Sequence, residues 1–331
     1  MKTITTQNGK IIITVREKPK LLHGHVLIRT EYSAISPGTE MILVRQASDR
    51  LVTLGYNAVG IVEQVGDGIQ HIQVGQRVAC YGAPYVHHAE WLAVPANLVT
   101  VVPDHVDPQE AAFAGLGAIA IHALRVAQLQ FGESVVIVGL GILGNMITQI
   151  AQAAAYRTIG LDLREDRVAM LQERGFSHMY HSQAEMEERL ADAAGRYGVD
   201  AVLHCASGPG EQLINSSLKW IRDRGKIVIV GDLTAEFSRE LMFGKEAQVL
   251  ISRAGGPGRY DPQYERENKD YPIGHVRWTE GRNVEEYIRL LADGRISIKN
   301  LITNLYSIDD AEEAYMNYRT PTETIATVIK Y

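Results

Sequence analysis

The run VVIVGLGILGN at residues 135–145 constrains the fold of this chain more than any other feature. It places Gly139, Gly141 and Gly144 in G-x-G-x-x-G spacing, after an apolar strand-like run and before a stretch whose apolar residues share one helical face. The first glycine permits the tight turn, the second lets the backbone approach a pyrophosphate, and the third packs helix on strand. Because a helix N-terminus favours anions, this context predicts a strand–turn–helix site for a dinucleotide.

Strand-like and helix-like runs alternate from Gly132 to about Ser252, which predicts an α/β fold with a doubly wound parallel sheet. Asp162 ends the second strand, 23 residues after Gly139, where a carboxylate can accept hydrogen bonds from both ribose hydroxyls of NAD and would repel a 2′-phosphate. Arg164 leaves room for some NADP use. The residues expected to bind NAD are Gly139, Gly141, Ile142, Leu143, Gly144, Asp162, Arg164, Ser207 and Gly231.

The first 102 residues are different, because short strand-like runs alternate there with Gly, Pro, Asn and Asp and show little helical periodicity. This pattern predicts a β-rich unit, in which SAISPGTE (33–40) forms a polar loop with a turn at Pro37 and Gly38. Asp107 and Pro108 are typical of an N-cap and first helical residue, and a long Ala-rich helix is expected to follow them. His204, in an expected central strand, is interpreted as a packing residue.

Composition excludes several classes of partner. The chain has 331 residues, a formal charge of −6 and no run of Lys or Arg, so neither nucleic acid nor an anionic membrane is an expected partner. Its two cysteines are far apart, which argues against a disulfide framework or a cysteine metal cluster. Without an apolar leader at the start or an 18-residue apolar run, the protein is expected to be cytoplasmic and to bind a small molecule.

Several motifs together resemble the medium-chain dehydrogenase/reductase (zinc-type alcohol dehydrogenase-like) family, whose first domain is GroES-like: HVLIRTEYSAISPGTE, LGYNAVGIVEQVG, VGQRV, HHAEWLAVP, VVIVGLGILGN and GKIVIVG. The resemblance covers nearly the whole chain. It implies a GroES-like catalytic domain at 1–122 and 254–331 and a Rossmann NAD-binding domain at 123–253. The apolar run EAQVLIS is expected at an open sheet edge, which predicts a homodimer.

The zinc motifs of the family are altered. Where zinc-using members have Cys-Gly-Ser/Thr-Asp, this chain has Pro37, or Ser36 if a residue is inserted, before Gly38-Thr39-Glu40; Gly55-Tyr56-Asn57 stands where the family has Gly-His-Glu. None of these residues suits zinc. The chain therefore resembles a zinc-lacking branch that includes bacteriochlorophyllide dehydrogenase and sugar-pathway oxidoreductases, and no metal is expected.

Without zinc, side chains must handle the hydroxyl proton when hydride moves. Thr39 matches the family's proton-relay hydroxyl, or is simply a turn hydroxyl. Tyr56 has three possible roles. It is a proton donor, a base if a neighbouring charge lowers its pKa, or a side chain that only fills the space a metal would occupy. Because adjacent strand residues point oppositely, only one of His87 and His88 can face the substrate. Ser36, Glu40 and Asn57 are candidate substrate-binding residues, with Glu40 expected to orient the loop rather than titrate.

The irregular segment 253–283 is rich in Tyr, Trp and Arg, and its Arg277 and Trp278 are candidate substrate-binding residues. A subunit contact would explain the same composition. The expected function is NAD-dependent, zinc-independent hydride transfer to or from a secondary alcohol or ketone of a sugar, cyclitol or other polyol. A quinone or enone reductase of the same family and a non-catalytic dinucleotide-binding protein are the alternatives.

Overall fold

The computed structural model describes residues 1–46, 49–319 and 324–331, which form two compact units. Unit 1 comprises Met1–Ala118 and Gly255–Tyr331, and unit 2 comprises Ile119–Ala254. Among the described residues, no helix is both long enough and apolar enough to span a bilayer.

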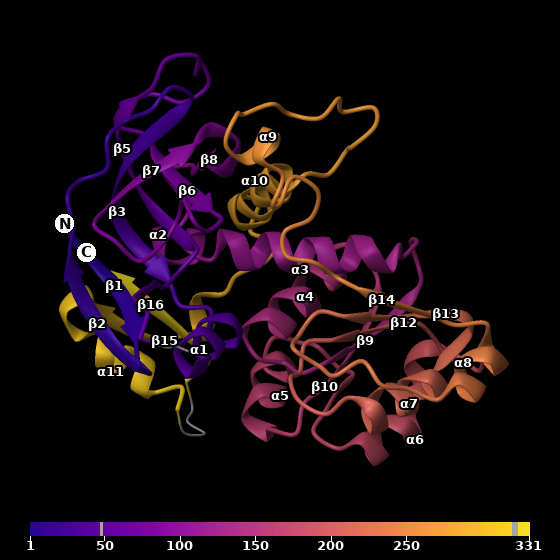
Figure 1. The fold of residues 1–331 in the computed structure, drawn as a ribbon. Coiled ribbons are helices and arrows are strands. Elements are labelled where there is room, and N and C mark those ends of the chain that lie inside the picture. Colours follow the sequence, from indigo (N-terminus) through magenta and orange to yellow (C-terminus); the bar gives the residue numbers. More distant parts are fainter. Residues whose placement is uncertain (47–48, 320–323) are drawn as a thin grey trace. The chain divides into compact units, whose positions relative to one another are not determined.

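Unit 2 is a doubly wound α/β domain, as the alternating pattern predicts. Its sheet is parallel throughout and has the order β11-β10-β9-β12-β13-β14, with helices α4 to α8 around it (Figure 1). The order reverses between β9 and β12, where such sheets bind ligands beyond the carboxyl ends of their strands. Its elements are β9 (Ser134–Val138), α4 (Ile142–Ala153), β10 (Arg157–Leu161), α5 (Glu165–Gln172), β11 (Met179–Tyr180), α6 (Gln183–Ala194), β12 (Val199–His204), α7 (Glu211–Trp220), β13 (Ile221–Ile229), α8 (Arg239–Lys245) and β14 (Gln248–Ile251).

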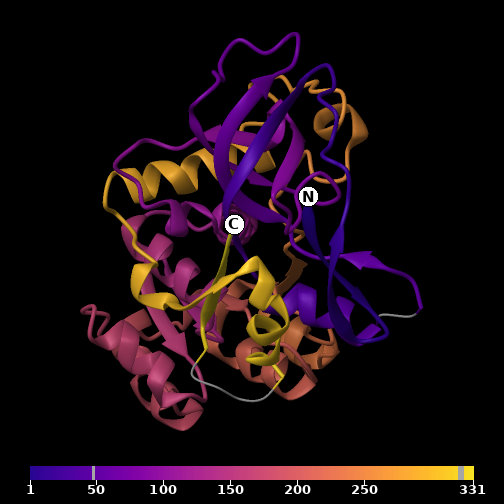
Figure 2. The ribbon, with the colours of Figure 1, turned by 90° about the vertical axis from the view of Figure 1, so that its left-hand side faces the viewer.

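Unit 1 is the β-rich, GroES-like unit. It contains a three-stranded sheet, β2-β1-β4, and a seven-stranded sheet in which β7 also pairs with β3. The C-terminal strand β16 pairs with β3, so segments from both ends of the chain share one sheet (Figure 2). Its strands are β1 (Lys2–Gln7), β2 (Lys10–Val15), β3 (His25–Ala34), β4 (Val52–Thr53), β5 (Asn57–Val65), β6 (Arg77–Tyr81), β7 (Trp91–Pro95), β8 (Val99–Val101), β15 (Ile302–Ser307) and β16 (Ala326–Lys330). Its helices are α1 (Pro37–Gln46), α2 (Pro108–Ala111), α9 (Pro262–Glu265), α10 (Glu280–Ala292) and α11 (Ala311–Met316), with short 3₁₀ turns at Ala96–Leu98, Lys299–Leu301 and Ile308–Asp310.

The expected long helix after Asp107 is interrupted. Its start is confirmed, because the Asp107 side chain accepts a hydrogen bond from Gln109 N and Pro108 is the first helical residue. The helix ends at Ala111, however, and α3 (Ala114–Ala127) begins after a turn. Composition alone did not reveal this break, since Ala-rich sequence has high helix propensity on both sides of it.

Candidate active site

SAISPGTE is not a loop with a turn: Ser33 and Ala34 end β3, and Pro37 begins helix α1, so the turn predicted at Pro37 and Gly38 is wrong. Pro37 occupies the first helical position, where its missing N–H costs nothing and its fixed φ suits a helix. The Glu40 carboxylate reaches back to Ser36, whose N–H donates to Oε1 at 2.7 Å. This bond satisfies a backbone group at the helix start, much as in a capping box. Glu40 thereby positions Ser36 at the start of α1.

Glu40 also belongs to a buried chain of hydrogen bonds with His88. His88 Nε2 lies 3.0 Å from Glu40 Oε2, and its Nδ1 lies 2.6 Å from Ser33 Oγ. Tyr315 donates to the same Glu40 oxygen, and the Tyr331 hydroxyl lies 2.8 Å from Ser33 Oγ. Ser33, His88 and Glu40 are fully buried. Although the set resembles a Ser-His-acid triad, its hydrogen-bonding groups are already engaged with one another, and it supports the start of α1 through the bond between Glu40 and Ser36 N.

The two adjacent histidines point to different surroundings, but they precede β7 and lie outside any strand, so the strand argument does not apply to them. His88 faces the Ser33–Glu40 chain, whereas His87 is half-buried and its Nε2 has no partner within the described part of the chain. Burial, helped by Arg16 and His88, lowers the pKa of His87 to about 4. A neutral imidazole of such low basicity is a poor proton acceptor near pH 7.

Tyr56 is partly exposed, and its hydroxyl donates to Ser36 Oγ. The exposed Thr39 hydroxyl lies within hydrogen-bonding reach of the same phenol. Burial raises the pKa of Tyr56 to about 12, the Glu40 charge acts in the same direction, and the bonds to Ser36 and Thr39 oppose it. This direction contradicts the idea that a neighbouring charge lowers the pKa to make Tyr56 a base. At neutral pH Tyr56 is a phenol that can donate a proton.

Asn57 is a fully buried polar residue with open hydrogen-bonding capacity. Neither side-chain atom has a partner of good geometry among the described residues, although the amide is near enough to the Tyr56 phenol to act on its pKa. A Cβ on Gly115 would lie 2.0 Å from Asn57 Oδ1 and 2.2 Å from a Tyr81 ring carbon, so only glycine fits there. An unpaired buried amide is energetically costly. The Asn57 amide is therefore suited to form hydrogen bonds with a hydroxyl group of a bound ligand.

These residues do not fit zinc, which the family's name implies. At the positions where zinc ligands would stand, the chain has a hydroxyl or proline, a phenol with a raised pKa and a neutral amide, whereas zinc prefers thiolate, imidazole and carboxylate. Both ring nitrogens of His88 already have protein partners. In the part of the chain that the structure describes, no group of three His, Cys, Asp or Glu side chains could hold a metal ion.

The segment 253–283 is partly built into the core of unit 1. Tyr264 is buried, stacks on Tyr271 with ring centroids 5.6 Å apart, and donates to Thr279 Oγ1 at 2.9 Å. By contrast, Arg277 is exposed and stacks on the half-buried Trp278, with its guanidinium carbon 3.9 Å from the ring centroid. Part of the Tyr and Arg richness therefore reflects packing, while Arg277 and Trp278 keep surface available for a ligand.

The glycine turn of unit 2 has the geometry that a dinucleotide requires. Gly139 has φ +89°, which L side chains rarely adopt, and a Cβ on Gly144 would lie 1.7 Å from Gly139 O. Gly141 is the N-cap of α4, which begins at Ile142 and continues through Leu143. Open N–H groups at this helix start can receive a pyrophosphate. Ser207 and Gly231 follow β12 and β13 at the same carboxyl edge of the sheet.

Asp162 lies beside this turn, and its carboxylate already accepts backbone hydrogen bonds. Leu140 N donates to Oδ2 at 2.6 Å and Arg164 N donates to Oδ1 at 2.9 Å. The Arg164 side chain is paired with Asp166, whereas Arg167 Nη1 lies 3.3 Å from Asp162 Oδ2. The guanidinium that faces the Asp162 carboxylate is therefore that of Arg167, which the sequence analysis missed. The signal was available, since Arg167 is on the first turn of α5.

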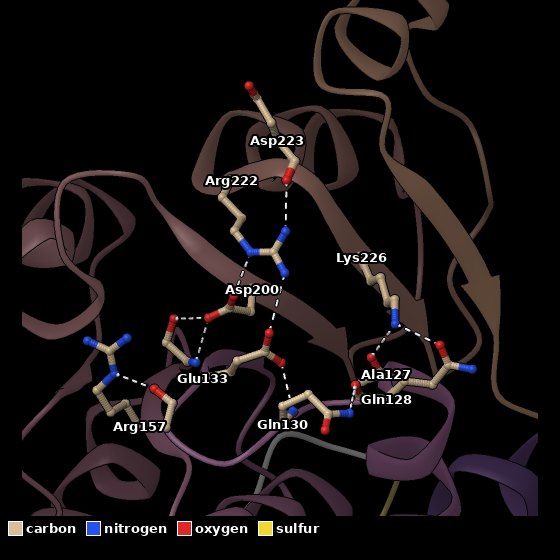
Figure 3. A network of polar contacts seen from close by, with 11 residues as sticks. Ala127, Gln128, Gln130, Glu133, Arg157, Asp200, Arg222, Asp223 and Lys226 are labelled. Carbon is tan, nitrogen blue, oxygen red and sulfur yellow. Dashed lines mark hydrogen bonds and ion pairs between the residues drawn. The ribbon is translucent and has the colours of Figure 1, made fainter.

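A second polar network lies at the opposite edge of the unit 2 sheet, where the strands begin (Figure 3). Asp200 accepts hydrogen bonds from Ser134 N at 2.8 Å and from Arg222 Nε at 2.6 Å, and Arg222 also reaches Glu133. Lys226 donates to Ala127 O at the end of α3. This network joins the starts of β9, β12 and β13, so it serves the sheet rather than the dinucleotide turn.

The chain belongs to the medium-chain, zinc-type alcohol dehydrogenase-like family. An alcohol dehydrogenase GroES-like domain matches residues 23–104, and a zinc-binding dehydrogenase domain matches residues 143–266, together more than half of the chain. This confirms the resemblance drawn from the motifs and makes the protein an oxidoreductase of the alcohol dehydrogenase type. The match to a zinc-binding family does not extend to its zinc ligands, as the site residues show.

Curated relatives include polyol-related enzymes. D-xylulose reductase of Saccharomyces cerevisiae is 25% identical, with 100% of this chain and 99% of the relative covered. Sorbitol dehydrogenase of Halalkalibacterium halodurans is 23% identical, with 94% of each chain covered. An alcohol dehydrogenase of Escherichia coli, solved with NADH, has a TM-score of 0.81 at 19% identity over 100% of this chain and 99% of its own. That structural likeness establishes the shared fold.

Proposed function

We propose that this protein is an NAD-dependent, zinc-independent dehydrogenase that interconverts a secondary alcohol and a ketone on a sugar, cyclitol or similar polyol. The observation that carries the proposal is the group formed by Ser36, Tyr56 and Asn57, in which hydrogen-bonding side chains replace the zinc ligands of the family. The names of the relatives support a polyol substrate, and Asp162 beside the glycine turn supports NAD.

A bound NAD cofactor would accept the hydride in alcohol oxidation and, as NADH, supply it in ketone reduction, and the residues of this chain manage the oxygen and its proton. In the reducing direction, the Tyr56 phenol donates a proton to the carbonyl oxygen as that oxygen gains negative charge. Ser36 and Thr39, which contact the phenol, are placed to return a proton to it. The Asn57 amide can both donate to and accept from hydroxyl groups, so it is suited to hold the substrate beside Tyr56.

Catalysis by Tyr56 is testable with one substitution. Tyr56→Phe removes the proton donor while keeping the ring, so we expect kcat to fall by about 10²-fold or more while NADH binding is unchanged. The assay is stereospecific NAD(H) turnover across a panel of sugars, cyclitols and polyols, with NADH affinity measured by fluorescence titration. Tyr197→Phe, on an exposed tyrosine of unit 2, is the matched control.

Two outcomes would contradict the proposal. Unchanged kcat in Tyr56→Phe on every substrate that the wild type turns over would remove Tyr56 from the chemistry. Turnover of enones or quinones, with none of any polyol in the panel, would show that the protein is a reductase of activated double bonds.

A further inference from the structure

Glu280 is a buried carboxyl group that the proposed chemistry does not use. It is the first residue of α10, follows the N-cap Thr279, and has no solvent exposure. Neither of its oxygens has a hydrogen-bond donor within the described ranges. An ionised carboxylate in this position would be desolvated and unpaired, which is among the costliest arrangements a protein can contain.

The nearest positive charge is committed to another carboxylate. Arg259 Nη1 forms an ion pair with Glu265 Oε1, which also accepts a hydrogen bond from Tyr260 N at 3.0 Å. Arg259 Nη2 donates to Ala83 O at 2.8 Å. The Glu265 charge therefore disfavours ionisation of Glu280. A protonated Glu280 adds no charge to this group, whereas an ionised Glu280 would add a second negative charge near Glu265.

The tyrosine hydroxyl groups around Glu280 do not donate hydrogen bonds to it. The Tyr264 hydroxyl donates to Thr279 Oγ1, and the Tyr271 hydroxyl donates to Asp261 Oδ2. Tyr81 also faces the Glu280 charge. The titratable and charged groups around Glu280 are therefore Glu265, Arg259, Tyr81, Tyr264 and Tyr271. Burial first and Glu265 second raise the pKa of Glu280 to about 9, with Arg259 opposing them.

Tyr81 links this acid pair to the candidate active site. Its hydroxyl accepts a hydrogen bond from Gly255 N at 3.2 Å. A Cβ on Gly255 would lie 2.9 Å from a Tyr81 ring carbon and 3.2 Å from Glu280 Cβ, so the three residues are in close contact. The Tyr81 ring packs edge-on against Tyr56, with centroids 5.9 Å apart and planes at 72°. A displacement of Glu280 would therefore reach Tyr56 through one intervening ring.

We infer that Glu280 is a neutral carboxylic acid near the Glu265 carboxylate, and that this acid pair is a positioning element which holds Tyr81 against Tyr56. Ionisation of Glu280 places two carboxylates against one arginine and drives them apart. The Gly255–Tyr81 contact then loosens, and Tyr56 loses its fixed orientation. The inference rests on the proposed function for its effect on turnover, but the proton on Glu280 exists independently of any substrate.

The first test measures how kcat falls with pH on the alkaline side of the pH–rate profile, referred to as the alkaline limb. A single group with pKa about 9 leaves roughly a tenth of the protein protonated at pH 10, so wild-type kcat should fall about tenfold there. Glu280→Gln keeps a neutral side chain at every pH, so we expect its kcat to stay level over this range. Glu286→Gln, on the same helix and paired at the surface with Arg289, should retain the wild-type limb.

Glu265→Gln is the second test, and here the alkaline limb should shift rather than disappear. It removes the neighbouring negative charge and frees Arg259 to pair with Glu280, so the alkaline limb should move to lower pH. If Glu280→Gln fails to fold, this variant still tests the inference. A limb that stays in place in Glu265→Gln, or survives in a folded Glu280→Gln, would overturn it.

The third measurement needs no substrate. Infrared spectroscopy of the wild type at pH 7 should show the C=O stretch of a buried protonated carboxyl group, which disappears near pH 9 and is absent from Glu280→Gln. A protein that shows this band but turns over no polyol would contradict the proposed function alone. A wild type without the band would contradict the acid pair, whatever its activity.

Discussion

His204 should make unit 2 sensitive to mild acid. It ends the central strand β12, is fully buried, and its Nε2 lies 3.0 Å from Ser217 Oγ. Ser217 Oγ donates its own proton to Leu213 O, so Nε2 must be the protonated nitrogen. Nδ1 has no partner among the described residues. A second proton on this ring would therefore create a buried, unpaired charge, and burial lowers the pKa of His204 to about 4.

The sign and size of the effect follow from this shift. Above pH 6.5 the imidazole is neutral in both the folded and the unfolded chain, so it contributes no pH dependence to the free energy of unfolding. Below pH 6.5 the unfolded chain takes up a proton that the folded chain refuses, so stability falls by about 1.4 kcal/mol per pH unit. The loss reaches about 2 kcal/mol at pH 5 and about 3 kcal/mol at pH 4, and levels off below that.

Native-state hydrogen exchange can measure this loss in unit 2 alone, because it reports the opening free energy of β9, β12 and β13 directly. His204→Gln removes the titrating ring, so its opening free energy should decline less between pH 6.5 and 5, by the same 2 kcal/mol or so. His181→Gln, on an exposed histidine of the same unit, is the control. Parallel pH dependences for the wild type and His204→Gln would refute the reasoning, whatever their offset at neutral pH.

Three further outcomes are expected. Asp162→Ala should erode a preference for NADH over NADPH, because it removes the carboxylate beside the glycine turn; tighter wild-type binding of NADPH in titrations would contradict the NAD assignment. Ile251→Glu should leave the protein monomeric in sedimentation at micromolar concentration, since β14 is an edge strand and Ile251 is 64% exposed; a monomeric wild type would remove the predicted dimer. Elemental analysis should find no stoichiometric zinc, and exhaustive chelation should leave activity intact; activity lost to chelator and restored by zinc would sink the metal-free mechanism.

The fold was predictable from the sequence where local chemistry determines it. The glycine spacing requires a positive φ at Gly139 and close packing at Gly144, and both are present. Asp107 and Pro108 mark a helix start that the structure confirms. Ser36-Pro37, followed by Glu40, carries a similar signal, but the adjacent Gly38 suggested a turn. Pro-Gly is ambiguous, because proline suits the second position of a turn and the first position of a helix equally.

The candidate site was less predictable, because its contacts join residues far apart in the chain. Ser33 and Tyr331 are 298 residues apart, and no periodicity links Glu40 to Tyr315. Glu280 stood in a segment interpreted as a ligand or subunit surface, yet its side chain is buried. The charged and aromatic residues of that segment suggested a ligand or subunit surface. Which of its side chains are buried depends, however, on how the segment folds back onto Tyr81.

In the proposed mechanism, buried hydrogen bonds do the positioning that a metal ion would otherwise do. On the proposed function, Tyr56 binds the reacting oxygen; its hydroxyl donates to Ser36, which Glu40 positions at the start of α1. Glu40 can serve this role because His88 Nε2 and the Tyr315 hydroxyl hold its other oxygen in place. Such a site depends on several buried residues at once, since hydrogen-bond networks lose more than the sum of their pairs when one member is removed. The proposed chemistry is therefore expected to be sensitive to substitutions well away from the residues that touch substrate.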